Sequence, residues 1–95
     1  MHYPAIFERE MTSARPAEGC VETAEVVQRD DGKWQINVAV SWRRGVIFTV
    51  NKYDIRDIRL YSKCATALAH IATTYDYWGP ITVKPHKDAG SKSSF

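Results

Sequence analysis

The sequence has few cysteines and no long apolar run, and each absence excludes a class of protein. Its two cysteines, Cys20 and Cys64, are too few for a framework of disulfide bonds, which favours a reducing compartment. No apolar run approaches the roughly 18 residues of a membrane span, and residues 1–8 lack the basic and then apolar stretches of a signal peptide. We therefore expect a soluble, cytoplasmic protein without membrane contacts.

Sequence signatures of catalysis and metal binding are missing as well. The three histidines, His2, His70 and His86, are far apart, and no Walker, Gly-x-Gly-x-x-Gly or Ser-His-Asp pattern occurs. Cys64 follows Lys63 near the start of a predicted helix, where a thiolate is favoured, but it shares an apolar stripe and is predicted to be a buried small side chain. His70 is predicted to be solvated on the outer face of that helix. We expect no enzyme activity, cofactor, metal or small-molecule substrate.

Length and composition predict one folded domain. The chain has 95 residues, of which 44% are hydrophobic and 25% are charged, as in ordinary globular proteins. Residues 1–20 lack a sustained period and are predicted to be an irregular arm, whose segment 5–7 either packs back on the domain or forms a short strand. Residues 21–85 form the predicted domain, and residues 86–95 a flexible basic tail.

A β-hairpin is the clearest local prediction. Residues 21–28 alternate as a strand does, and Asp30-Asp31-Gly32 supplies residues that tolerate left-handed backbone angles in a tight turn. The next strand has large apolar side chains at every second position, and these are predicted to form the centre of the core: Trp34, Ile36, Val38, Val40 and Trp42.

The remaining elements complete an α+β fold. Residues 46–50 are predicted to form a third strand, residues 55–61 a fourth strand or a short helix, and residues 81–83 a last strand. Ser62 is the predicted N-cap of a helix over about residues 63–76, with an apolar stripe at Cys64, Leu68, Ile71 and Tyr75. We expect an antiparallel three- to five-stranded sheet, a meander, packed on one face by this single helix.

Charge is distributed unevenly along the chain. Residues 1–31 carry three Arg and seven Asp or Glu, a net charge of −4, whereas residues 32–95 carry ten Lys or Arg and four Asp, a net charge of +6. The middle of the chain contains a candidate basic patch with aromatic neighbours that suits DNA or a protein partner. Its members are Arg43, Arg44, Lys52, Arg56, Arg59 and Lys63, with Trp42 and Tyr53 as aromatic contacts. The alternative is a solvated strand edge protected by charge.

Two further surfaces are candidates for binding. Acidic residues along the first long strand can imitate phosphate and occupy a nucleic-acid-binding groove of another protein; the alternative is a solvated sheet face. This acidic set is Glu18, Glu22, Glu25, Asp30 and Asp31. Tyr77 and Trp78, after the helix, are typical of interfaces, although such rings also close the bottom of a core.

The order of these elements resembles that of the small ParC-type partition-associated proteins of bacterial plasmids. The resemblance covers about residues 21–85: a hairpin around Asp31-Gly32-Lys33-Trp34, then Arg59-Leu60-Tyr61-Ser62 before the helix, then Gly79 and a strand to Val83. Lys63-Cys64 departs from the Leu-Asp expected after the serine.

The resemblance implies a non-catalytic accessory protein of a mobile genetic element, with a role in plasmid maintenance through protein or DNA contacts. The alternative is a phage- or plasmid-encoded inhibitor of a host nuclease or a CRISPR-type defence complex, similar to an anti-CRISPR protein. An uncovered edge strand would also allow a homodimer.

Overall fold

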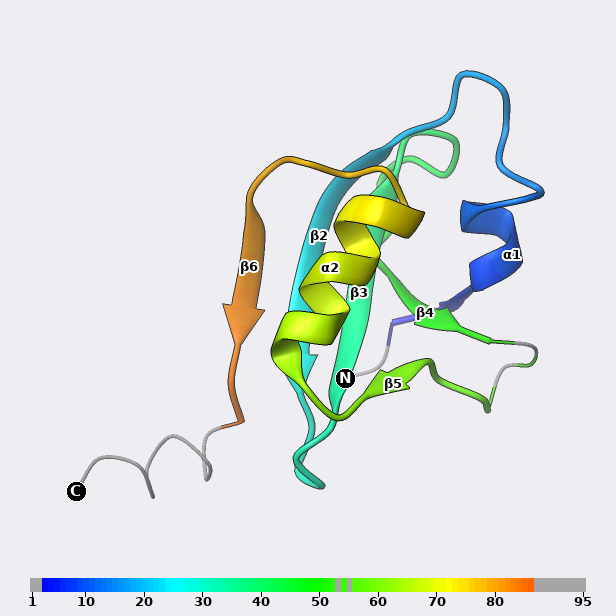
Figure 1. Cartoon of the computed structure of the whole chain (residues 1–95). Coiled ribbons are helices and arrows are strands. Elements are labelled where there is room, and N and C mark those ends of the chain that lie inside the picture. The colour runs from blue at the N-terminus through cyan, green and yellow to red at the C-terminus, as the bar shows by residue number, and fades with distance from the viewer. Residues whose placement is uncertain (1–2, 53, 55, 87–95) are drawn as a thin grey trace.

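A mixed six-stranded sheet with one main helix forms the body of the protein (Figure 1). The computed structural model describes residues 3–52, 54 and 56–86. The strands are β1 (Ala5–Phe7), β2 (Val21–Gln28), β3 (Trp34–Val40), β4 (Phe48–Asn51), β5 (Leu60–Tyr61) and β6 (Ile81–Lys84), and the helices are α1 (Glu8–Met11) and α2 (Cys64–Thr74). No helix among these residues is long and apolar enough to cross a membrane.

The hairpin of β2 and β3 confirms the clearest sequence prediction. The two strands pair antiparallel along almost their whole length. In the turn, the Asp31 carboxylate accepts a hydrogen bond from the Lys33 amide at 2.9 Å, and Gly32 has a φ of 86°, which glycine adopts without a steric penalty. Local turn chemistry thus positions the two longest strands.

The sheet is mixed, so the prediction of an entirely antiparallel sheet is wrong, although β2, β3 and β4 form the expected antiparallel meander. The strand order is β1-β4-β3-β2-β6, and β5 pairs with β3 beside this path. β1 runs parallel to β4, and β6 runs parallel to β2. The parallel direction of β6 arises because α2 carries the chain back along the sheet before β6 begins, a connection that a tight turn cannot provide. β5 pairs over only two residues, so the predicted fourth strand is much shorter than expected.

The N-terminal segment contains regular structure that packs into the core. Residues 5–7 form β1, which was one of the two outcomes expected for this segment, and residues 8–11 continue directly into α1. Ile6 is 1% exposed, and Met11 is completely buried. Residues 5–11 therefore differ from the irregular arm predicted for this part of the chain.

The core lies between the sheet and α2, with the side chains that the alternation of β3 predicts. Ile36, Val38 and Val40 are buried, while Trp34 and Trp42 at the ends of the stripe are half-buried. On β2, Ala24 and Val26 pair with Val38 and Ile36 and are buried on the same face. Together these side chains make the floor on which α2 packs.

Helix α2 has the expected apolar stripe but not the expected N-cap. Ile71 and Tyr75 are completely buried, and Cys64 and Leu68 are half-buried. The prediction that Ser62 caps the helix is wrong. The N-cap residue is Lys63, whose extended backbone (φ −129°, ψ 137°) delays the first helical residue, and its side chain makes no capping hydrogen bond. Ser62 therefore lies one residue too early to satisfy the first-turn amides.

Candidate binding site

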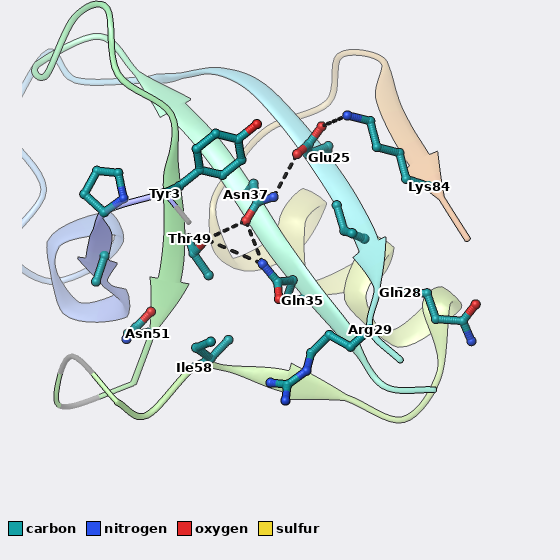
Figure 2. Close-up of a pocket in the computed structure, with 13 residues that line it drawn as sticks. Tyr3, Glu25, Gln28, Arg29, Gln35, Asn37, Thr49, Asn51, Ile58 and Lys84 are labelled. Carbon is teal, nitrogen blue, oxygen red and sulfur yellow. Dashed lines mark hydrogen bonds and ion pairs between the residues drawn. The ribbon is translucent and has the colours of Figure 1, made fainter. Parts of the chain in front are cut away.

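The face of the sheet opposite α2 carries an open groove of about 790 Å³ (Figure 2). Strand register explains its floor: Glu25 pairs with Asn37, and Asn37 pairs with Thr49, so these side chains point to the face that α2 does not cover. Gln35, two residues before Asn37, lies on the same face. We call this feature the sheet-face groove and these four residues its polar row.

Hydrogen bonds fix the polar row in one arrangement. The Asn37 amide nitrogen donates to Glu25 Oε2 at 2.8 Å, and the Asn37 amide oxygen accepts from Thr49 Oγ1 at 2.8 Å. Gln35 Nε2 donates to the same Asn37 oxygen at 3.2 Å. Asn37 is 3% exposed and Thr49 is 7% exposed, so both lie at the bottom of the groove. The floor is therefore a preorganised set of donors and acceptors.

The Glu25 carboxylate is ionised within this row. Partial burial opposes its charge, but the hydrogen bond from Asn37 and the ammonium of Lys84 outweigh that effect and lower the pKa of Glu25 below its ordinary value. Lys84 Nζ lies 2.9 Å from Glu25 Oε1, and this contact raises the pKa of Lys84. The polar row and Lys84 together thus join β4, β3, β2 and β6 through polar side chains.

The rim of the groove combines an aromatic ring, a cation and apolar side chains. Tyr3 lies over the row and is 39% exposed, and Arg29 and Ile58 line the opposite end (Figure 2). Arg29 also lies 3.4 Å from Asp31 of the hairpin turn. Among the described residues, no group of three or more His, Cys, Asp or Glu side chains could hold a metal ion. The arrangement suits recognition of a neutral or mixed-charge ligand by hydrogen bonds.

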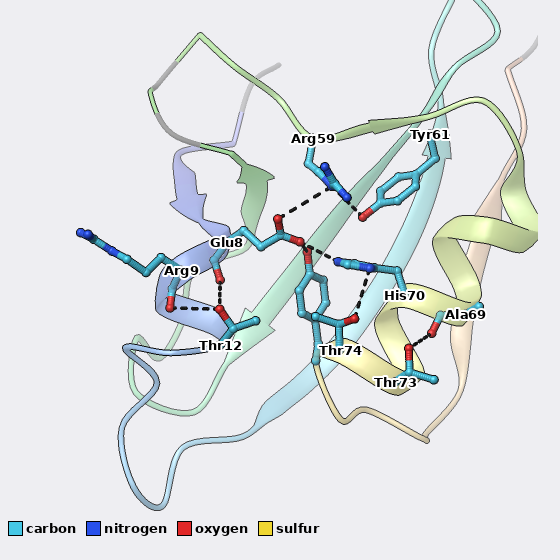
Figure 3. A network of polar contacts seen from close by, with 10 residues as sticks. Glu8, Arg9, Thr12, Arg59, Tyr61, Ala69, His70, Thr73 and Thr74 are labelled. Carbon is cyan, nitrogen blue, oxygen red and sulfur yellow. Dashed lines mark hydrogen bonds and ion pairs between the residues drawn. The ribbon is translucent and has the colours of Figure 1, made fainter.

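A second polar cluster links α1 to α2 on the other side of the sheet (Figure 3). Glu8 Oε2 accepts a hydrogen bond from the Tyr75 hydroxyl at 2.8 Å and lies 2.6 Å from His70 Nε2. Arg59 Nε lies 3.8 Å from Glu8 Oε1 and donates to the Tyr61 hydroxyl at 3.1 Å. Burial opposes the Glu8 charge, but the bonds from His70 and Tyr75 and the Arg59 charge lower the Glu8 pKa. We call this cluster the Glu8 clasp.

The prediction of a solvated His70 is wrong. Its ring lies between the rings of Tyr61 and Tyr75, with centroid distances of 5.5 and 4.9 Å. The outer side of α2 is not solvent here, because α1 brings Glu8 against it. Burial is the main cause that raises the pKa values of Tyr61 and Tyr75, so neither hydroxyl ionises near neutral pH.

The structure divides the predicted basic patch among several places. Arg43 binds both oxygens of the Glu10 carboxylate, at 2.6 and 2.8 Å, and Arg59 belongs to the Glu8 clasp. Arg44 lies with Arg43 in the β3–β4 connection, Lys52 and Arg56 lie in the β4–β5 connection, and Lys63 precedes α2. These connections leave the sheet at different sides (Figure 1).

The predicted acidic set is also spread out. Glu18 and Glu22 are exposed near the start of β2, whereas Asp30 and Asp31 are exposed in the turn at its far end. Glu25 alone lies in the groove.

The aromatic candidates have different surroundings. Trp42 is half-buried and donates to Glu10 at 2.7 Å, and the Tyr77 hydroxyl donates to the Pro80 carbonyl at 2.7 Å. Trp78 is 74% exposed, and Tyr53 lies outside the described residues.

The remaining candidates for chemistry fit their predicted roles only in part. Cys64 is half-buried, and burial raises the pKa of its thiol, which disfavours the thiolate that a nucleophile needs. The His86 amide donates to the Gln28 side chain at the rim of the groove. His2 lies outside the described residues.

The sequence analysis named Glu25 as a binding candidate but missed the other three residues of the polar row. Gln35 and Asn37 occupy every second position opposite the apolar stripe of β3, and this was the available signal. Alternation alone predicts that such residues belong to an ordinary solvated face. The parallel strands β1 and β6 enclose the row, and their positions depend on contacts distant in sequence.

In comparisons with known proteins, no family model, curated protein or solved structure matches the chain.

Proposed function

We propose that this protein is a non-catalytic binding protein that holds an extended, polar segment of a partner protein in the sheet-face groove. The observation that carries the proposal is the polar row, because Asn37 and Thr49 are buried and hydrogen-bonded before any ligand arrives. Because these donors and acceptors are already fixed, the site loses less conformational entropy when a ligand binds. Peptide backbone, with alternating N–H and C=O groups, complements such a floor.

Charge favours a protein partner over DNA. The charged side chains that line the groove are Arg29, Lys84 and Glu25, and Lys84 is already paired with Glu25. Phosphate recognition needs several Lys or Arg side chains that contact one backbone. Arg43 and Arg59 of the predicted basic patch instead face carboxylates of α1. The groove therefore suits a partner of balanced charge.

The biological setting follows from the resemblance of residues 21–85 to ParC-type partition-associated proteins. In this setting the protein is a cytoplasmic accessory factor of a mobile genetic element, and it contributes to plasmid maintenance by binding another protein of the partition machinery.

A second candidate function is inhibition of a host nuclease or a CRISPR-type defence complex. It is supported by the exposure of Glu18, Glu22, Asp30 and Asp31, although Asp31 is also paired with Arg29 at 3.4 Å. Exposed carboxylates can meet a basic surface of a partner. We expect inhibition through these residues to be lost when Glu18 and Glu22 are changed to Gln, and groove binding to be unaffected by that change.

Selection from a displayed library of random peptides tests the groove. Selected peptides are measured by fluorescence anisotropy against the wild type, Arg29→Ala and Arg44→Ala. Each variant removes one arginine, but only Arg29 lines the groove. We expect Arg29→Ala to weaken binding about tenfold, as for a central contact residue, and Arg44→Ala to have little effect. Equal affinity of the wild type and Arg29→Ala for every selected peptide would refute groove binding.

A labelled DNA duplex distinguishes the nucleic-acid alternative. Phosphate contacts make the affinity for DNA fall steeply as salt rises. If the protein binds DNA through the predicted basic patch, Arg44→Ala should weaken that binding and Arg29→Ala should not. We expect the duplex not to bind, even at low salt. Tight, steeply salt-dependent binding would replace the protein-partner proposal with one for DNA.

A further inference from the structure

Strand β6 forms an outer edge of the sheet. In the described part of the chain it pairs with β2 and with no other strand. Edge strands are usually protected by a short length, proline, a bulge or a charged side chain such as Lys. Residues 81–84 contain no proline, and their single charge, on Lys84, is held by Glu25 at 2.9 Å. Thr82, Val83 and Lys84 are exposed.

We propose that β6 pairs antiparallel with β6 of a second copy of this chain, across a two-fold axis perpendicular to the sheet. The pairing would extend the sheet from one molecule into the next and supply backbone partners for the outer side of β6. This inference stands apart from groove binding, because it uses the outer side of β6 and not the polar row.

Strand register limits how the two copies can meet. Ile81 and Val83 align with Ala24 and Val26, so they point to the face that α2 covers, whereas Thr82 points to the groove face. The proposed two-fold axis keeps the groove faces of both copies on one side of the extended sheet and the faces covered by α2 on the other. Residues can therefore lie opposite one another only when they share a face. Of the registers that pair at least three residues of each β6, two satisfy this condition, one centred on a Thr82–Thr82 pair and one centred on a Val83–Val83 pair.

The register centred on Thr82 buries more apolar surface. It places Ile81 of each copy opposite Val83 of the other, which gives two apolar cross-strand pairs, and Val83 is 42% exposed before pairing. The register centred on Val83 gives one apolar pair and puts Thr82 opposite Lys84. The first register also leaves Lys84 at the end of the ladder, where it keeps its contact with Glu25.

The geometry predicts a concentration-dependent dimer with both grooves on one side. Pro80 and Pro85 flank β6 and confine the ladder to about the length of that strand, so the interface is small. Since the axis leaves each face on its own side, both grooves open in the same direction. A partner with two binding segments would then bind both copies at once, with a gain in avidity.

Cysteine cross-linking tests the pairing and its register. In a Cys20→Ser background, Thr82→Cys would place two thiols opposite each other, at a Cα separation of about 4.5–5.5 Å that a disulfide accepts. Thr23→Cys is the matched control, because Thr23 is also exposed but lies on β2. We expect mild oxidation to cross-link Thr82→Cys at least about tenfold faster than Thr23→Cys. Equal rates, or cross-linking of Val83→Cys but not of Thr82→Cys, would overturn the proposal.

Sedimentation equilibrium provides a second readout that needs no cysteine. The average mass of the wild type should rise with concentration, and Val83→Lys should abolish the rise, because it would place a charge opposite Ile81 of the other copy. Val46→Lys, at a position 39% exposed in the β3–β4 connection, should behave as the wild type does. Circular dichroism checks that each variant is folded. A wild type that stays monomeric at about 1 mM, where even a millimolar interaction is populated, would overturn the proposal.

Discussion

The Glu8 clasp predicts a specific loss of stability when Glu8 is changed to Gln. The substitution keeps the shape of the side chain and removes its charge. In the folded protein, Glu8 Oε2 meets the Tyr75 hydroxyl at 2.8 Å and His70 Nε2 at 2.6 Å. Both groups donate to the carboxylate, and a hydrogen bond to a charged acceptor is stronger than one to a neutral acceptor. Both contacts should therefore weaken when the charge is lost.

The expected magnitude follows from these two contacts. A hydrogen bond to a charged group contributes about 1.5–3 kcal/mol, but a glutamine oxygen can still accept one neutral bond. The side chain of Glu8 is 23% exposed, so solvent screens only part of the interaction. We expect Glu8→Gln to lower the free energy of unfolding by about 1–3 kcal/mol at neutral pH.

Chemical denaturation as a function of pH measures this effect. The folded-state pKa of Glu8 lies below the ordinary value of 4.5, so on acidification the unfolded chain takes up a proton before the folded one. The stabilisation is fully present above the unfolded-state pKa and is lost as pH falls through the lower, folded-state pKa. The stability difference between the wild type and Glu8→Gln should therefore shrink in acid.

Two comparisons make this prediction refutable. Glu22→Gln removes an exposed carboxylate on β2 and should change stability by less than about 0.5 kcal/mol. A double-mutant cycle of Glu8→Gln with Tyr75→Phe should give a coupling energy of about 0.5–2 kcal/mol. A Glu8→Gln variant as stable as Glu22→Gln at every pH, with no coupling to Tyr75→Phe, would show that the clasp contributes nothing.

Three further predictions test the core, the turn and the cysteines. Met11→Ala should cost about 2–5 kcal/mol in urea unfolding because Met11 is completely buried; a cost below about 0.5 kcal/mol would mean that α1 is not docked. Gly32→Ala should cost about 1 kcal/mol because of its φ of 86°, and Gly32→Asn should cost less; equal costs would contradict a left-handed turn residue. A thiol reagent should label exposed Cys20 faster than Cys64 in the native protein, and the reverse order would revive Cys64 as a nucleophile.

Sequence reasoning succeeded where structure is decided locally. The period of two in β3 and the turn at Gly32 together determine the hairpin and its buried face, because neither depends on distant residues. The apolar spacing of α2 likewise identifies the side that meets the sheet. Ser62 shows the limit of local reasoning: its type suits an N-cap, but the extended backbone of Lys63 moves the helix start by one residue.

The parallel pairings and both polar clusters depend on residues that are distant in sequence. β1 joins β4 across more than 40 residues, and the contact of Glu8 with His70 spans 62. No periodicity of the sequence around β1 or Glu8 predicts these long-range contacts. The same limit applies to the polar row, where Asn37 reads as a solvated strand residue until its partner Thr49 is placed beside it. Charge counting alone grouped Arg43 with Arg44, although in the contacts that the structure describes Glu10 binds Arg43 and not Arg44.

The position of β1 has a consequence for the order in which the protein acquires its structure. A ribosome makes residues 5–11 before their partners in β4 and α2, which follow tens of residues later. Until then Ile6 and Met11 have no core to enter, although they are among the most buried side chains of the finished protein. The nascent chain must therefore carry these apolar side chains exposed until β4 and α2 have been made. This segment would therefore dock well after it is translated, once β4 and α2 are present.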